Sequence, residues 1–322
     1  MTKTIAVVFA ALFIAAKTQA QLLSGLTGIT DTTFSNRSAF AGAKKQYPDI
    51  SLPTVTAMPA VSIQYDVTYN KTGKRSLKLD AFYPKEKKEN NHIAIIMIYG
   101  GGWRSGNKTQ HHALAQQLAA KGYVCFTPEY RLSTEALFPA AVYDLKAAIR
   151  WVREHAASYN IDTNKIVTAG FSAGGELASF LATTGDMPLF EGVNAPAATS
   201  SKINALVNID GTLSFVHAES SETTDTSSRI GGSTYWFGYT QKENFKLMEA
   251  GSPLTFAGPR TPPSLFINSS IARMHAGRDD FTRILESNHI YTEVHTFPNT
   301  PHTFCLFEPW FTPTVNYIDA FS

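Results

Sequence analysis

From residue 93 to the C-terminus, short apolar runs alternate with segments of helical spacing, and this alternation constrains the fold more than any other feature of the chain. The run at residues 93–99 is almost continuously apolar, which is typical of a strand buried on both faces of a parallel sheet. The expected strands are residues 93–99, 123–127, 165–169, 203–209, 264–268 and 291–297. The expected helices are residues 108–120, 140–157, 172–183 and 279–286, with a last one near Val315. We therefore predict an α/β fold, with a mostly parallel central sheet and helices on both faces.

Three other segments complete the predicted organisation. Residues 62–69 and 77–83 alternate in the strand manner around a turn, which predicts an antiparallel hairpin. Residues 21–60 have little periodicity, so we expect an arm lying on the surface. Residues 211–253 form an oversized connection carrying Tyr235, Trp236 and Phe237, which either cap a site or pin the loop to the core. Residues 61–322 are thus expected to form one domain.

The first twenty residues have the pattern of a secretory signal peptide. Lys3 precedes an apolar run over residues 5–16, and small residues follow at 18–20. We expect cleavage before Gln21, and hence an exported protein that is periplasmic or secreted. An uncleaved anchor is the alternative, although the run is short for a membrane span.

Composition and charge narrow the range of partners. Hydrophobic residues make up 43% of the chain and charged residues 17%, which indicates a folded globular protein. A formal net charge of +2 gives no general attraction to nucleic acid or to an anionic membrane, so we expect neither nucleic-acid binding nor stable membrane insertion. The two cysteines, Cys125 and Cys305, are expected to be buried thiols rather than a disulfide.

The segment Gly170-Phe171-Ser172-Ala173-Gly174 lies between an expected strand and an expected helix. At such a sharp turn, glycines relieve crowding and the Ser172 hydroxyl is held out toward the cleft. The amide of Ala173 then points toward any negative oxygen that forms beside the serine. A plain tight turn is the alternative interpretation, but the strand-turn-helix setting favours an activated serine.

A second glycine-rich segment, Tyr99-Gly100-Gly101-Gly102-Trp103, follows the strand expected at residues 93–99. Glycines let the backbone approach a substrate closely. The two motifs together resemble the hormone-sensitive-lipase and carbohydrate-esterase branch of the α/β-hydrolase family, and the resemblance extends over residues 62–322. It is also carried by the scaffold-like stretches at residues 129–132 and 138–140.

The resemblance implies a role for each motif. Ser172 is the expected nucleophile, and the backbone amides of Gly101, Gly102 and Ala173 are the expected oxyanion donors. His302 follows the last strand, where this family has its catalytic base. The chain departs from the family at Tyr99, where a histidine is usual.

The chain also departs from the family in the slot for the triad acid, residues 270–274, which contains no carboxylate. Asp279 is our choice for the acid, Asp280 is its rival, and Asp210 at the end of a strand is a third option. The first two have a competing explanation, because carboxylates are favoured in the first turn of any helix.

The loop at residues 268–280 resembles that of exported esterases from polysaccharide-degrading gut bacteria, which contain the same Asn-Ser-Ser, Arg and His-Ala-Gly-Arg-Asp elements. This resemblance implies esters of plant cell-wall polysaccharide as substrates. Arg273 and Arg278 could hold uronate carboxylates or pair within the protein, and Trp103 is a further expected substrate contact.

The expected function is therefore hydrolysis of carboxylic esters through a serine acyl-enzyme, with no metal or organic cofactor. Uronate methyl esters of pectin are the first substrate hypothesis, and acetyl esters of pectin or xylan are the second. Two competing interpretations are a peptidase of the same fold and a non-catalytic glycan-binding protein. The sequence does not decide the oligomeric state.

Overall fold

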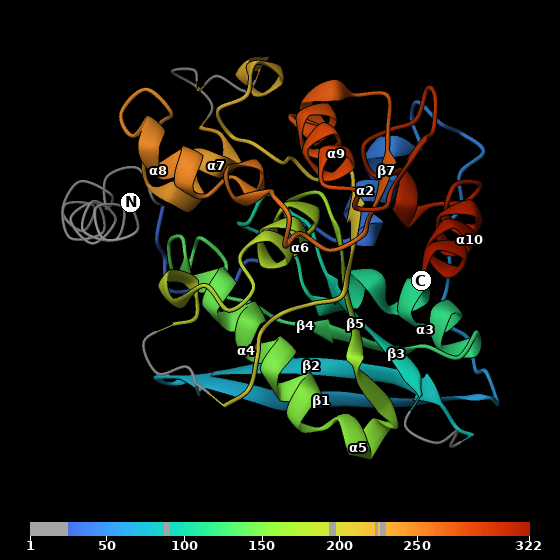
Figure 1. Ribbon diagram of the computed structural model, residues 1–322. Coiled ribbons are helices and arrows are strands. Elements are labelled where there is room, and N and C mark those ends of the chain that lie inside the picture. Colours follow the sequence, from blue (N-terminus) through green and yellow to red (C-terminus); the bar gives the residue numbers. More distant parts are fainter. Residues whose placement is uncertain (1–24, 87–90, 193–197, 223–224, 226–229) are drawn as a thin grey trace.

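An eight-stranded sheet forms the centre of the computed structural model, which describes residues 25–322 except 87–90, 193–197, 223–224 and 226–229 (Figure 1). Its order is β1-β2-β4-β3-β5-β6-β7-β8. The strands are β1 (Val61–Thr72), β2 (Arg75–Pro84), β3 (His92–Ile98), β4 (Val124–Pro128), β5 (Ile161–Phe171), β6 (Ala205–Ile209), β7 (Ser264–Asn268) and β8 (Thr292–Thr296). The predicted α/β fold is confirmed.

The two ends of the sheet differ in strand direction. β1 and β2 form the expected antiparallel hairpin, which turns at Gly73, a residue with a φ of +59°. β2 also pairs antiparallel with β4, and from β4 onward all neighbouring strands are parallel. Because parallel strands end at the same edge, the loops after β3, β5, β6, β7 and β8 meet there.

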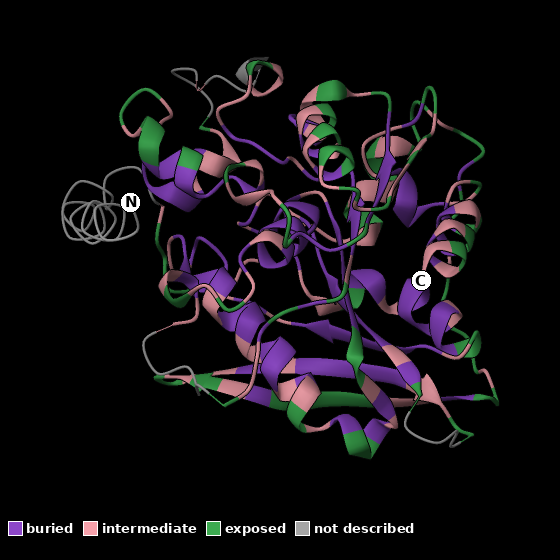
Figure 2. Cartoon of the chain, viewed as in Figure 1, coloured by how far each residue is buried: buried purple, intermediate pink, exposed green. Residues whose placement is uncertain are grey.

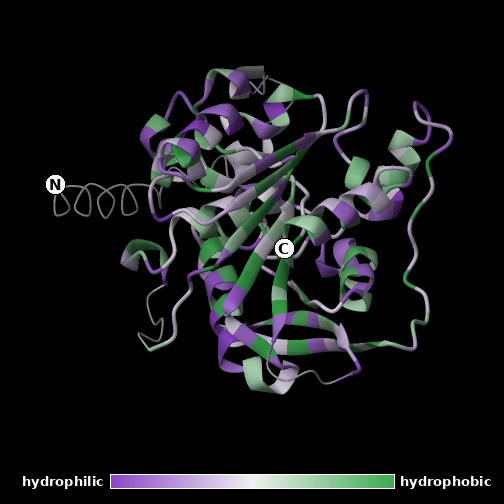
Figure 3. Cartoon of the chain, turned by 45° about the vertical axis from the view of Figure 1, so that its right-hand side comes forward, coloured by the Kyte–Doolittle hydropathy of each residue, from purple (hydrophilic) through white to green (hydrophobic). Residues whose placement is uncertain are grey.

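Helices cover both faces of the sheet. The helices are α2 (Asn36–Ala43), α3 (His112–Ala120), α4 (Ala140–Glu154), α5 (Ala156–Tyr159), α6 (Ala173–Thr183), α7 (Gly232–Phe237), α8 (Phe245–Ala250), α9 (Arg278–Ser287) and α10 (Phe311–Phe321). Apolar residues of α3 and α10 pack on one face, and those of α4, α6 and α9 pack on the other. The central strands β3, β4, β6 and β7 between them are largely buried, whereas the edge strands β1 and β8 are mostly exposed or half-buried (Figures 2 and 3).

β3 shows how one strand serves both layers. Ile95 and Met97 belong to the apolar cluster with α3 and α10, whereas Ile96 and Ile98 belong to the cluster with α4 and α6. A strand buried on both faces needs apolar residues at consecutive positions, which is the pattern read from the sequence.

The N-terminal arm contains the helix α2, which was not predicted because residues 21–60 have little hydrophobic periodicity. Ser35 caps α2, and its side chain and that of Ser38 form a reciprocal capping box. Phe40 packs edge-on against Phe307, with ring centroids 5.9 Å apart. The helix is therefore stabilised by capping at its start and by packing against the rest of the domain.

The long connection before β7 is anchored to the core by two of its three aromatic residues. Trp236 and Phe237 in α7 are buried, whereas Tyr235 is partly exposed and lies under the Arg104 guanidinium, 4.2 Å from its carbon. The pinning role predicted as one alternative therefore applies to Trp236 and Phe237.

Other expectations concern the chain ends and the cysteines. The predicted signal peptide, residues 1–20, lies outside the described residues. None of the helices in the described ranges combines the length and the apolar character of a membrane span. Cys125 and Cys305 are buried free thiols, as predicted, and burial raises the pKa of both.

Candidate active site

Ser172 lies at the bend between β5 and α6 in an unusual backbone conformation. Its φ of 56° and ψ of −122° fall in a sparsely populated region that is typical of strained functional positions. A Cβ on Gly170 would lie 2.0 Å from the Gly174 carbonyl oxygen, and a Cβ on Gly174 would lie 2.0 Å from the Ile98 carbonyl oxygen. Only glycine fits at these two positions, so the motif is needed to build the predicted strand-to-helix turn.

His302 lies in the loop after β8 and shares a hydrogen bond with the serine. Its Nε2 atom is 2.8 Å from Ser172 Oγ. The imidazole ring packs on Phe171, with centroids 4.9 Å apart. The two residues are 130 positions apart in the sequence, and the structure brings them together at the carboxyl ends of β5 and β8.

The carboxylate that contacts His302 is Asp210, directly after β6. Its Oδ2 atom is 2.7 Å from His302 Nδ1 and also accepts a hydrogen bond of 2.6 Å from Ser269 Oγ. Its Oδ1 atom accepts from the Ser269 amide at 3.1 Å and contacts His275 Nδ1 at 3.0 Å. Burial alone would raise the pKa of Asp210, but the hydrogen bonds from His275, His302 and Ser269 outweigh it and lower this pKa to about 2. Asp210 is therefore an anion at neutral pH.

The choice of Asp279 as the partner of His302 is thus wrong. Its side chain is 67% exposed and pairs with Arg278 at 2.6 Å. The rival Asp280 pairs with Arg283 and lies 3.5 Å from His217. Both occupy the first turn of α9 and pair with residues other than His302, which matches the competing explanation for acidic residues at a helix start.

The turn that carries Asp210 is fixed by a buried amide. The Asn208 side chain accepts from the Gly211 amide at 2.8 Å and donates to Ser179 Oγ in α6 at 2.8 Å. This links the end of β6 to the helix that follows Ser172. In the sequence, Asn208 and Asp210 flank the last residue of the apolar strand β6, which lies next to β5, the strand that leads to Ser172. This pattern was the signal in the sequence for Asp210.

The glycine-rich loop after β3 presents unused backbone donors beside the serine. Gly101 and Gly102 have φ values of 140° and 62°. Within the described part of the chain, the amides of Gly101, Gly102 and Ala173 donate no hydrogen bond. The Gln110 side chain holds the loop by accepting from the Gly100 amide at 2.8 Å and donating to its carbonyl at 3.2 Å. Free amides next to a serine can stabilise an oxyanion.

Tyr99 occupies the position where the family usually has a histidine, and it packs against another tyrosine. Its ring stacks on Tyr130, with centroids 4.3 Å apart, and the Tyr130 hydroxyl donates to the Tyr99 carbonyl at 2.9 Å. The start of the glycine loop is therefore supported by an aromatic pair.

These features coincide with the region matched by a protein family. The model of the BD-FAE family matches residues 79–291, more than half of the chain. The chain belongs to the BD-FAE family. The resemblance to α/β-hydrolase serine esterases is thereby confirmed.

Individual relatives agree with this assignment. The esterase LipC of Mycobacterium tuberculosis is 31% identical over 134 residues, which are 41% of this chain and 33% of LipC. The chain thus spans about a third of the length of that relative. A truncated carbohydrate esterase from gut microbiota superposes with a TM-score of 0.69 at 26% identity, covering 83% of this chain and 99% of the other. Propionate-bound esterase Est2 of Thermogutta terrifontis gives 0.65 at 26% identity, covering 83% and 94%.

In this BD-FAE protein, Trp103 does not have the substrate-facing position that we expected. The residue is 9% exposed, and its ring stacks on that of Trp236, with centroids 5.0 Å apart. Its Nε1 atom donates to Glu176 Oε2 at 2.9 Å. Burial raises the pKa of Glu176 well above its usual range, despite this hydrogen bond. Trp103 therefore anchors the glycine loop to α6 and to α7.

The two candidate substrate arginines differ. Arg278 donates to Asp279 Oδ1 and to Asn268 Oδ1, so it is paired within the protein. Arg273 lies in the 3-10 helix η5 (Ala272–His275), two positions before the Asp210 partner His275. Among the residues that the structure describes, Arg273 has no hydrogen-bond or ion-pair partner. Of these two arginines, only Arg273 has an unpaired guanidinium among the described residues.

The N-terminal arm supports the glycine loop from outside. Ser105 Oγ accepts from the Phe34 amide at 2.8 Å and lies 3.1 Å from Asp31 Oδ1. The Gly106 amide donates to the Asp31 carbonyl at 3.0 Å. The arm, which we expected only to lie on the surface, therefore contacts the loop that carries the free amides.

The Asp31→Ala variant is expected to lower kcat about threefold to tenfold, because loss of a partly buried hydrogen bond costs on the order of 1–2 kcal/mol and loosens the loop. Steady-state kinetics on a p-nitrophenyl ester measure this. Asp49→Ala, at an exposed position in the same arm, serves as the control. Equal kinetics for the two variants would show that the arm does not support the loop.

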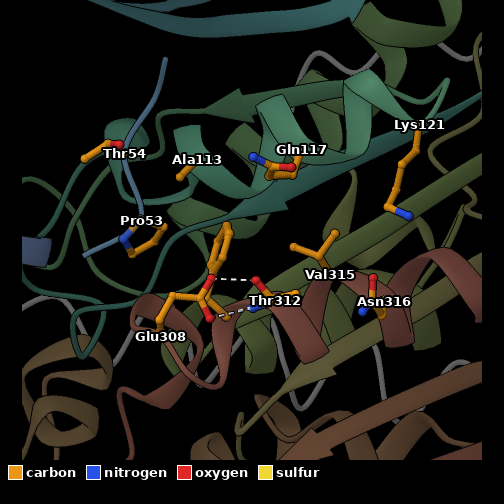
Figure 4. A pocket seen from close by; sticks show the side chains of 10 residues that line it. Pro53, Thr54, Ala113, Gln117, Lys121, Glu308, Thr312, Val315 and Asn316 are labelled. Carbon is orange, nitrogen blue, oxygen red and sulfur yellow. Dashed lines mark hydrogen bonds between the residues drawn. The ribbon is translucent and has the colours of Figure 1, made fainter. Parts of the chain in front are cut away.

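A pocket between α3 and α10 lies apart from this site (Figure 4). The arm residues Pro53 and Thr54 line its edge. Its Glu308 carboxylate accepts hydrogen bonds from Thr312, and Lys121 pairs with Asp319 at 2.7 Å. Its charged groups are therefore satisfied within the protein.

Proposed function

We propose that this BD-FAE protein hydrolyses carboxylic esters through an acyl-enzyme on Ser172. The observation that carries the proposal is the continuous series Ser172 Oγ–His302 Nε2 at 2.8 Å and His302 Nδ1–Asp210 Oδ2 at 2.7 Å. Asp210 fixes the imidazole tautomer whose Nε2 lone pair faces the serine hydroxyl, so His302 can accept the serine proton and later return one.

The reaction follows from this arrangement. His302 Nε2 takes the Ser172 proton as Oγ attacks the ester carbonyl carbon, and the amides of Gly101, Gly102 and Ala173 stabilise the negative oxygen. The carbon–oxygen bond to the alcohol breaks, and His302 gives its proton to the departing alkoxide. Water then loses a proton to His302 and attacks the acyl-enzyme, which releases the acid and returns the proton to Ser172.

The proposed substrates are uronate methyl esters of pectic polysaccharide. Support comes from Arg273, which lies in η5 two positions before the Asp210 partner His275 and whose guanidinium is unpaired among the described residues. A free uronate neighbouring the scissile ester would supply a carboxylate for it. The structural relative described as a carbohydrate esterase from gut microbiota is consistent with a glycan substrate. Acetyl esters remain the second candidate. The methyl-ester proposal relies on arginines that bind uronate carboxylates, and of the two arginines only Arg273 is unpaired, because Arg278 pairs with Asp279.

Product analysis tests the proposal. The protein is incubated with methylated pectin, acetylated pectin and acetylated xylan, and released methanol and acetate are quantified, with Ser172→Ala as the blank. We expect methanol release that the blank lacks. Acetate alone would replace the methyl-ester proposal by the acetyl-ester one, and release of neither, with no turnover of p-nitrophenyl acetate, would contradict ester hydrolysis.

The Arg273→Gln variant is expected to raise KM for methylated pectin about tenfold, because a hydrogen-bonded charge pair is lost. Hydrolysis of p-nitrophenyl acetate, which lacks a uronate, should stay within about twofold. Arg260→Gln, at an exposed position before the amino end of β7, is the matched control. A KM for pectin that is the same in both variants would exclude Arg273 as the uronate contact.

We also propose that the protein acts outside the cytoplasm after removal of residues 1–20, on the basis of the pattern in that segment. N-terminal sequencing of protein from the producing organism is expected to begin at Gln21. Detection of the intact Met1 terminus would contradict this.

A further inference from the structure

The Asp210 carboxylate is shared by two imidazoles rather than one. His302 Nδ1 lies 2.7 Å from Oδ2, and His275 Nδ1 lies 3.0 Å from Oδ1. The three residues come from three separate places in the chain: the end of β6, the 3-10 helix η5 and the loop after β8. The ester-hydrolysis mechanism uses His302 and leaves His275 without a role.

His275 is built into the site. Its exposure is 7%, and Asp210 is fully buried. A carboxylate anion only accepts hydrogen bonds, so an Nδ1 atom at this distance must carry a proton. His275 is therefore a donor to Oδ1, where the Ser269 amide at 3.1 Å is the only other donor within the described part of the chain.

We propose that His275 is a positioning residue for the Asp210 carboxylate, and this inference rests on the proposed esterase function. With His275 and the Ser269 amide on Oδ1, rotation of the carboxylate is blocked and Oδ2 stays directed at His302. The His275 hydrogen bond also draws part of the negative charge toward Oδ1. In the family, the triad acid usually follows β7, whereas Asp210 follows β6. His275 and Ser269 thus hold Asp210 in the orientation that a triad acid needs.

The surrounding charges set the expected pH effect. Four titratable groups lie around His275: Asp210 after β6, His302 after β8, Cys305 in η6 (Phe304–Leu306) and Glu219 in η3 (Ala218–Glu222). In the sequence, His275 lies between Arg273 and Arg278. Glu219 accepts from the Gly277 amide at 2.9 Å, and Arg278 is paired with Asp279. The direct neighbour of His275 is therefore the Asp210 carboxylate.

Loss of the His275 donor concentrates charge on the carboxylate oxygens. A more negative Asp210 favours the protonated form of the base beside it. The acidic limb of the kcat/KM–pH profile, which reports protonation of the base in the free enzyme, then moves to higher pH. Loss of orientation lowers kcat at the same time.

Two variants separate these effects from a mere packing role. His275→Phe keeps a ring but removes the donor, whereas His275→Asn places an amide nitrogen where Nδ1 was. For His275→Phe we expect kcat on p-nitrophenyl acetate to fall about tenfold to hundredfold and the acidic limb to move upward. For His275→Asn we expect kcat within about fivefold of wild type and an unmoved limb. His217→Phe, whose histidine contacts Glu219 and Asp280 instead, is the control and should match wild type.

The outcomes distinguish the inference from the function on which it rests. An inactive wild type contradicts the proposed function. An active wild type whose His275→Phe variant is folded and keeps the wild-type pH profile overturns the positioning role, even if its melting temperature drops. If His275→Phe does not fold, ¹⁵N-histidine NMR of the wild type decides: a proton on His275 Nδ1 is expected, and the Nε2-protonated tautomer overturns the proposal.

Discussion

The Asp210→Asn variant is expected to fold and to lose about 10³- to 10⁴-fold in kcat. An asparagine can present its amide to His302 Nδ1, and this favours the imidazole tautomer with its proton on Nε2. That proton would face Ser172 Oγ, which lies 2.8 Å from Nε2 in the wild type, and the base would be lost. Steady-state kinetics on p-nitrophenyl acetate and circular dichroism of the same samples measure the effect.

Asp279→Asn and Asp280→Asn are the matched controls, because their carboxylates are exposed and pair with Arg278 and Arg283 rather than with His302. Both are expected to keep kcat within about twofold, since exposed ion pairs contribute about 1 kcal/mol or less to stability. A large loss in Asp279→Asn with an active Asp210→Asn would restore the acid first chosen from the sequence.

The Gly174→Ala variant is expected to lose activity and to lower the free energy of unfolding by about 3 kcal/mol or more. The added Cβ would lie 2.0 Å from the Ile98 carbonyl oxygen, where neither β3 nor α6 has room to move. Urea denaturation and ester kinetics measure the two effects together.

Gly42→Ala provides the comparison for this glycine. Gly42 is exposed in α2, and a Cβ there meets nothing within 4 Å. An alanine in a helix is favoured over glycine by about 0.5–1 kcal/mol, so this variant should be as stable as wild type or slightly more stable. Equal stability for both variants would mean that the bend at Ser172 tolerates a side chain, contrary to the short distances between its backbone atoms.

Local chemistry made most of the fold predictable. Apolar runs as short as residues 93–99 favour strands buried on both faces, and the glycines at 170 and 174 allow one tight bend. These patterns do not depend on distant residues. The helix α2 was missed because its stability comes from the Ser35 cap and from docking against Phe307, and neither produces a hydrophobic period.

The acid was the hardest residue to assign. The family slot is empty, and the nearest carboxylates in sequence are Asp279 and Asp280. The residue in contact with His302 lies 92 positions before it and comes from another strand. Proximity in sequence therefore misled the choice, whereas the shared edge of parallel strands would have favoured Asp210. Trp103 was misplaced for a similar reason, because Trp236 in the later insertion covers it.

Covalent labelling of Ser172 tests the central claim most directly. The folded protein is treated with a fluorophosphonate, and tryptic peptides are mapped by mass spectrometry while the labelling rate is followed in wild type and in His302→Ala. We predict one adduct, on Ser172, that forms at least about 100-fold more slowly without the imidazole. An unlabelled wild type, an adduct on another residue, or equal rates in the two proteins would contradict an activated serine at the bend between β5 and α6.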